Sequence, residues 1–191
     1  MFKELLTSIL ISSALSAAPL EVPEEKMPAL PNKPSPFRGK VNHSGYVGHT
    51  WVGYPHVENP ASLDMDPPGR IFVAEANRFW FGVPDLRRAR EMIRDDFQAR
   101  TIEDRLAMYD KHAGKRDRAW YTQTPDRLIR LEDRDGNGVA DFRTLFSDAF
   151  KEPLDGIGFS ILAERNATYF TCIPALRKLT DPDDDGVADT N

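Results

Sequence analysis

The sequence predicts a mainly β protein that holds the first two blades of a β-propeller, incomplete, with a short helical insertion and a disordered N-terminal region. Runs of strand-forming residues alternate with turn residues from about residue 57 onward. An acidic nonapeptide also occurs twice, as DRDGNGVAD from Asp133 and as DPDDDGVAD from Asp181, a spacing of 48 residues. A repeat of about 40–50 residues with several short strands in each copy is typical of propeller blades.

The N-terminus has the pattern of a secretory signal. Lys3 precedes an apolar run at residues 5–11, and small residues follow at positions 12–18. We therefore expect residues 1–18 to be a signal peptide and the protein to be exported, to the periplasm or the cell surface. An uncleaved signal that keeps the protein associated with the membrane is the alternative.

Residues 19–56 are expected to form a linker and an N-terminal extension. Six prolines lie between Pro19 and Pro36 among charged residues, a composition typical of extended segments that pack poorly. The partial propeller is then expected to occupy residues 57–191.

The predicted strands follow the alternation of apolar and polar residues. A hairpin is expected where two strands flank the turn at residues 67–69, and a second hairpin is expected to have the first acidic motif as its turn. Three further strands should lead to the second motif. The seven expected strands are residues 60–66, 70–76, 126–133, 141–150, 157–164, 167–173 and 175–181.

A helical insertion is expected at about residues 84–118. Apolar residues recur at helical spacing after Asp85, an expected helix cap, and again after Thr101. The many arginines of this segment alternate with acidic residues, which favours a solvated, ion-paired helix face over an anion-binding one. Because the net charge is −5, we expect no nucleic-acid partner.

The two acidic motifs indicate calcium sites. In both copies oxygen-bearing side chains fall at positions 1, 3, 5 and 9, and a glycine at position 6 allows a sharp turn. A backbone carbonyl at position 7 could add a ligand. The expected metal-binding residues are Asp133, Asp135, Asn137, Val139 and Asp141 in the first copy, and Asp181, Asp183, Asp185, Val187 and Asp189 in the second.

The motifs allow two other interpretations. An EF-hand needs a glutamate at position 12 and flanking helices, but Thr144 stands at that position and strands are expected on both sides. Plain turns remain an alternative, because Asp, Asn and Gly are the residues that turns prefer. Four oxygen positions in register twice would nevertheless place like charges together without a cation.

Other candidates for chemistry are weak, and the sequence identifies no catalytic residue. His43, His49 and His56 have spacings that suit neither a helix face nor a strand face for a metal pair. The single cysteine, Cys172, is expected to be a buried small residue. Glu75 ends an apolar strand, where pairing or solvation is more common than a role in a central channel.

Four segments together resemble a known family. They are PASLDMDPPGRIFVAEA, TIEDRLAMYDK, DRLIRLEDRDGNGVADFRTLFSD and PLDGIGFSILAERNATYFTCIPALRKLTDPDDDGVADT. Over roughly residues 57–191 the chain resembles the N-terminal part of membrane-bound dehydrogenase-type, haem-binding β-propeller proteins of planctomycete-like bacteria. These are similar to the glucose/sorbosone dehydrogenase propellers that use pyrroloquinoline quinone (PQQ).

The resemblance implies a six- or seven-bladed propeller that oxidises a sugar or alcohol and passes electrons to a c-type haem domain. This chain has no C-x-x-C-H motif, and of the family's functional residues only the acidic loops carry over to it, so PQQ and haem c are expected only in a full-length parent. We therefore expect an inactive, truncated N-terminal portion whose partners are the remaining blades and the cytochrome domain. A calcium-stabilised binding or adhesion module without enzymatic activity is the alternative.

Overall fold

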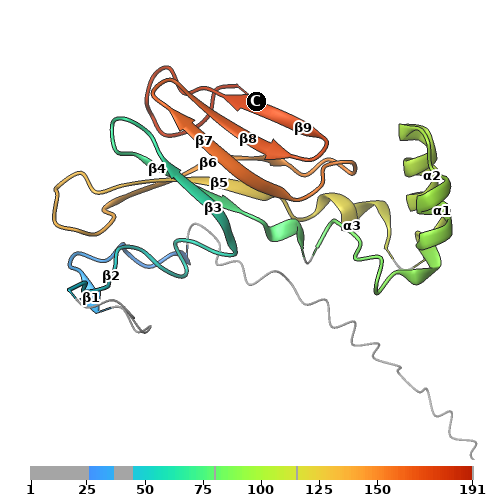
Figure 1. The fold of residues 1–191 in the computed structure, drawn as a ribbon, viewed down its shortest axis with the longest axis horizontal. Helices are drawn as coiled ribbons and strands as arrows, with labels where there is room; N and C mark the ends of the chain where they lie inside the picture. Colours follow the sequence, from blue (N-terminus) through green and yellow to red (C-terminus); the bar gives the residue numbers. More distant parts are fainter. Residues whose placement is uncertain (1–25, 37–44, 80, 115, 191) are drawn as a thin grey trace, which may run out of the picture.

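The protein is mainly β, as predicted, and its strands form three antiparallel sheets (Figure 1). The computed structural model describes residues 26–36, 45–79, 81–114 and 116–190. The expected signal peptide, residues 1–18, and His43 lie outside the described residues. The seven strands expected after residue 57 are confirmed, with bounds that differ by one or two residues.

The first sheet has four strands in the order β3-β4-β5-β6. The turn between β3 and β4 closes where Gly69 donates its N–H to the carbonyl of Asp66 at 2.9 Å. Gly69 has a φ of +97°, which a residue without a side chain adopts at no steric cost. The strands are β3 (Pro60–Met65), β4 (Ile71–Glu75), β5 (Asp126–Glu132) and β6 (Phe142–Phe150).

The second sheet has three strands in the order β7-β8-β9, namely β7 (Gly158–Glu164), β8 (Ala167–Cys172) and β9 (Ala175–Leu179). It lies against the first sheet, with β7 in contact with β3 and β4 (Figure 1). Burial alternates along β8, where Thr168, Phe170 and Cys172 are buried and the residues between them are partly exposed. This period of two shows that one face of the second sheet points toward the first.

An apolar core joins the two sheets. Phe150 of the first sheet packs on Phe170 of the second with ring centroids 4.6 Å apart. Cys172 is fully buried in this core, as predicted, and burial raises the pKa of its thiol to about 12. The buried residues of the core are Phe72, Ala74, Leu128, Phe146, Phe150, Ala163, Phe170, Cys172 and Leu179.

The opposite face of the first sheet is covered by the N-terminal extension. A two-stranded sheet of β1 (Ser35–Pro36) and β2 (His49–Thr50) precedes it. Leu30, Trp51 and Val52 pack against the buried face of the first sheet. Within residues 26–36 and 45–56 the structure thus differs from the expected poorly packed linker, because an apolar sheet face must be covered and these side chains cover it.

The helical insertion connects β4 to β5 and runs further than residues 84–118. Thr101 begins a helix as predicted, with a capping box in which its hydroxyl accepts the N–H of Asp104 at 3.1 Å. Asp85 does not cap a helix. It forms a single turn with Arg87, and regular helix begins later. The elements are the short 3-10 helices η2 (Asn77–Phe79) and η3 (Arg90–Met92), then α1 (Ile93–Gln98), α2 (Ile102–Lys111) and α3 (Arg118–Thr122).

Ion pairs cover the surface of the insertion, which confirms the ion-paired helix face. Lys111 and His112 both contact the carboxylate of Asp95, at 2.8 and 2.7 Å. Arg118 forms a two-bond pair with Asp110. Among the helices of the described residues, none has the length and apolar character needed to cross a membrane.

Candidate metal sites

The two acidic loops occupy equivalent places in consecutive sheets. The first loop, residues 133–141, connects β5 to β6, and the second loop, residues 181–189, follows β9. Glu132 pairs with Phe142 across the first loop, and Thr180 forms a bridge with Thr190 across the second. Both residues of the second pair lie 48 positions after their counterparts, so the sequence repeat is also a repeat of strand register.

The backbone of the two loops follows the same path. Gly136 and Asp184, at position 4, have φ values of +71° and +58°. Gly138 and Gly186, at position 6, have φ values of +90° and +93°. Asp184 adopts a left-handed conformation, which aspartate tolerates better than most residues with a side chain.

The same side-chain to backbone hydrogen bonds form in both loops. Asp133 accepts the N–H groups of Asn137 at 3.1 Å and Gly138 at 2.9 Å. Asp181, its counterpart, accepts those of Asp185 at 3.2 Å and Gly186 at 3.0 Å. The first aspartate therefore folds each loop around its own carboxylate.

Three carboxylates come together in each loop. One oxygen from each of Asp133, Asp135 and Asp141 lies within 4.8 Å of the others, and the same holds for a second group, which consists of Asp181, Asp183 and Asp189. Calcium is held by such hard oxygen ligands at 2.3–2.6 Å from the ion. Positions 1, 3 and 9 of the predicted ligand set are thus gathered in both loops.

The residues at positions 5 and 7 form hydrogen bonds within each loop. Asn137 and Asp185, at position 5, each use an oxygen to accept the N–H at position 7, from Val139 at 3.0 Å and from Val187 at 2.8 Å. Asp185 is not part of the acidic group of its loop. Thr144, at position 12 of the first copy, donates its hydroxyl to the carbonyl of Gly186 in the second loop at 2.6 Å.

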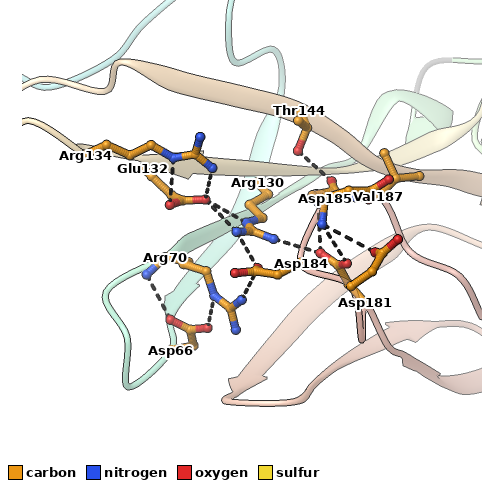
Figure 2. A network of polar contacts seen from close by, with 12 residues as sticks. Asp66, Arg70, Arg130, Glu132, Arg134, Thr144, Asp181, Asp184, Asp185 and Val187 are labelled. Atoms are coloured by element: carbon orange, nitrogen blue, oxygen red, sulfur yellow. Dashed lines mark hydrogen bonds and ion pairs between the residues drawn. The ribbon is translucent and has the colours of Figure 1, made fainter.

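The charge around the second loop sets it apart from the first. The guanidinium of Arg130, a β5 residue whose side chain is 1% exposed, lies 2.7 Å from Asp181 and 2.7 Å from Asp184 (Figure 2). Arg70 also contacts Asp184, at 2.6 Å, and holds Asp66 on its other side. These two arginines bind the second loop to the first sheet.

The pKa directions agree with this arrangement. Burial raises the pKa of Asp181, although the N–H of Gly186 and the charge of Arg130 oppose the rise. Burial alone would also raise the pKa of Asp184, but its bonds to Arg130 and Arg70 outweigh that effect and leave the pKa below its usual value. The second loop is therefore partly neutralised by the protein itself.

In the first loop, the arginine pairs with a residue outside the acidic group. Arg134, which lies inside the loop sequence, pairs with Glu132 at 3.1 Å (Figure 2). Its guanidinium also stacks on the ring of Phe142. Asp141 accepts two backbone N–H groups, from Arg134 at 2.9 Å and from Asp135 at 3.1 Å. The carboxylates of the first loop are therefore less neutralised by neighbouring cations than those of the second.

A buried arginine, Arg78, was not found by sequence reasoning. Arg78 donates to five backbone carbonyls, at distances from 2.7 to 3.3 Å, and so ties the insertion to the sheets. Glu75 is fully buried and pairs with Arg127 at 2.7 Å, as its position at a strand end suggested. His56 is buried and His49 exposed, and neither belongs to an acidic group.

The fold and the loops define a class of mainly β proteins in which consecutive antiparallel sheets carry equivalent acidic loops. The model of a family described as a domain of unknown function (DUF7133) matches residues 42–191, and the chain belongs to that family. No curated protein and no solved structure gives a significant match.

Proposed function

We propose that this chain is a calcium-stabilised scaffold in which the first and second sheets are consecutive blades of a β-propeller. The observation that carries the proposal is the repeat of loop, backbone conformation and strand register in two sheets that pack face to face. Blades of a propeller are small antiparallel sheets repeated around an axis. The first sheet, with four strands in sequential order, has the composition of such a blade.

Calcium would hold the turn after the third strand of each blade. The ligands in the first loop would be Asp133, Asp135 and Asp141, with the carbonyl of Val139 as a further oxygen. In the second loop Asp181, Asp183 and Asp189 would serve, with lower affinity because Arg130 already contacts Asp181. The ion would offset the repulsion among the gathered carboxylates.

A place in an exported dehydrogenase-like protein is the wider proposal. It is supported by the order of the four segments that resemble PQQ-type sugar or alcohol dehydrogenases with a haem c domain. The residues of this chain would then be scaffold, and the cofactors would be held by other parts of the parent. A calcium-stabilised binding or adhesion module is the second candidate, and the two repeated acidic loops support it equally well.

Calcium titration by calorimetry tests the scaffold proposal. We expect binding to the intact chain, and we expect Asp133→Asn or Asp135→Asn to weaken it by at least about tenfold, because each removes a charged ligand. Calcium at about 100 times Kd should raise the free energy of unfolding by ~2.7 kcal/mol.

Asp148→Asn is the matched control. Asp148 lies on β6 with its side chain 47% exposed, outside both loops, so the same loss of one charge should leave calcium affinity unchanged. A folded chain that shows no heat of calcium binding would leave the loops as hydrogen-bonded turns and would overturn the proposal.

A further inference from the structure

The second sheet has an outward face that points away from the first sheet. Along its strands the residues of this face alternate with those of the buried core. The side chains of Leu162 and Leu176 on this face are 54% and 68% exposed. The outward face consists of the side chains of Ser160, Leu162, Tyr169, Thr171, Leu176 and Lys178.

The outward face of the second sheet resembles the face of the first sheet against which the second sheet packs. In the first sheet Phe72 pairs with Arg130 across β4 and β5. In the second sheet Tyr169 pairs with Lys178 across β8 and β9. An aromatic residue and a cation thus occupy matching places, and Lys178 lies 48 positions after Arg130.

The neighbouring pair matches as well. Ala74 pairs with Leu128 in the first sheet, and Thr171 pairs with Leu176 in the second. A small residue therefore faces a leucine in both sheets. In the first sheet Ala74 and Leu128 are fully buried beneath the second sheet, whereas Leu176 is exposed.

The first strand of each sheet completes the comparison. Ser62 and Ser160 occupy matching positions, each paired with the small residue of the next strand. Asp64 and Leu162 also match in position but not in chemistry. Asp64 accepts the N–H of Ala163 at 2.8 Å, so an occupant of the outward face would meet an apolar contact at Leu162 in place of that hydrogen bond.

The charge at the matching position indicates what the occupant brings. Arg130 holds the second sheet by pairing with Asp181 and Asp184 of its acidic loop, each at 2.7 Å (Figure 2). Lys178 is exposed, and its place on the outward face is that of Arg130. A shallow apolar groove of about 240 Å³ lies beside it, between Leu162, Tyr169 and Leu176.

We infer that the outward face binds a further antiparallel β-sheet of the same repeat, with Lys178 paired to the aspartates of that sheet's acidic loop. The inference rests on the blade repeat proposed above and names the surface that continues it. The occupant presents an apolar sheet face like that formed by Ala163, Phe170 and Leu179, and it carries a loop like residues 181–189.

Thiol protection in an extended chain tests the inference. A copy of residues 143–190 is placed directly after Thr190, so that the added strands continue the 48-residue register. Leu176→Cys is introduced into the original and extended chains, with Cys172→Ala in every copy. We expect the thiol at position 176 to react with a maleimide at least about tenfold more slowly in the extended chain, which corresponds to ~1.4 kcal/mol of docking.

Two controls isolate the face and the charge. Ile173 is 68% exposed, like Leu176, but lies in the turn between β8 and β9. The thiol of Ile173→Cys should therefore react with the maleimide at the same rate in both chains. Lys178→Glu should return the thiol at position 176 of the extended chain to the fast rate. Lys178→Arg should keep the thiol protected, because an arginine pairs with the acidic loop at the matching position 130.

Equal reactivity at positions 173 and 176 in the extended chain overturns the inference. So does protection of position 176 in the original chain that grows with protein concentration, which would make a second copy the occupant. The rates are measured with calcium and with a chelator. Thiol protection without calcium binding would count against the calcium scaffold alone. Calcium binding without thiol protection would count against this inference alone.

Discussion

The carboxylate of Asp126 is fully buried where β5 begins. It accepts the N–H of Arg78 at 2.7 Å and that of Gly158 at 2.6 Å, and it therefore joins the insertion and the start of β7 to the first sheet. Burial raises the pKa of Asp126 from 3.8 to about 6, more than its two hydrogen bonds and the charge of Arg78 lower it. The folded protein therefore keeps a proton on this carboxyl up to a higher pH than the unfolded chain does.

This raised pKa predicts a pH dependence of stability. The contribution of Asp126 is complete below about pH 4, where the unfolded chain is also protonated, and is lost as the pH rises to about 6. A rise from 3.8 to about 6 corresponds to ~3 kcal/mol. The free energy of unfolding of the intact chain, minus that of Asp126→Asn, should therefore fall by up to that amount between pH 4 and pH 7.

Urea titrations at several pH values measure this difference. Asp148→Asn, which removes one charge from a half-exposed carboxylate on β6, serves as the control. A difference between the intact chain and Asp126→Asn that stays constant with pH would contradict the prediction.

At the scale of the element, the second loop depends on a glycine that touches a neighbouring strand. A Cβ atom at Gly186 would lie 2.7 Å from the hydroxyl of Thr144 on β6. Gly69, in the turn between β3 and β4, has a similar φ of +97° but open space around it. The two glycines therefore separate backbone strain from steric conflict.

Alanine substitutions use this contrast. Gly69→Ala should lower the free energy of unfolding by about 1–2 kcal/mol, the cost of a left-handed residue with a side chain. Gly186→Ala should cost about 3 kcal/mol or more, because the clash with Thr144 adds to the same strain. Thermal unfolding of both variants measures the difference. Equal losses of stability would mean that Thr144 moves aside without a cost in free energy.

At the scale of the whole molecule, Arg130 couples the two sheets. Its buried guanidinium contacts Glu132 of its own strand and Asp181 and Asp184 of the second loop. The pair with Asp184 is shared with Arg70, which in turn holds Asp66. One network thus runs from the turn after β3 to the loop after β9.

Removal of this cation should weaken the contact between the sheets. Arg130→Met should lower the free energy of unfolding by about 3 kcal/mol in a chelator, because it leaves the buried carboxylate of Asp181 without its cation. Calcium should restore part of the loss by neutralising the second loop. Arg134→Met is the control: its side chain is 49% exposed and pairs only with Glu132, so its loss should stay below about 1 kcal/mol.

Chemical denaturation with and without calcium distinguishes these effects. If Arg130→Met is as stable as the intact chain in the chelator, the network does not hold the sheets together. If calcium restores nothing while the first loop still binds it, the second loop is not a calcium site.

The order of strands and the place of the loops were predictable from the sequence alone. Alternating residues such as Leu63 and Met65, and turn residues such as Gly69, act over a few positions, so local preference determines them. The acidic repeat likewise placed both loops after the third strand of a sheet. Helix bounds were predicted less well, because the short helix α3 is only five residues long and its start depends on its neighbours.

The tertiary structure alone decided which charges meet. Arg130 and Asp181 are 51 positions apart in sequence, and Asp126 contacts Gly158 over 32 positions, so no local pattern reveals these contacts. The difference between the two loops arises in the same way, since Arg130 reaches the second loop only when the sheets pack. Sequence spacing determined where acidic residues gather, and the packing of the sheets determined which of them already have a cation.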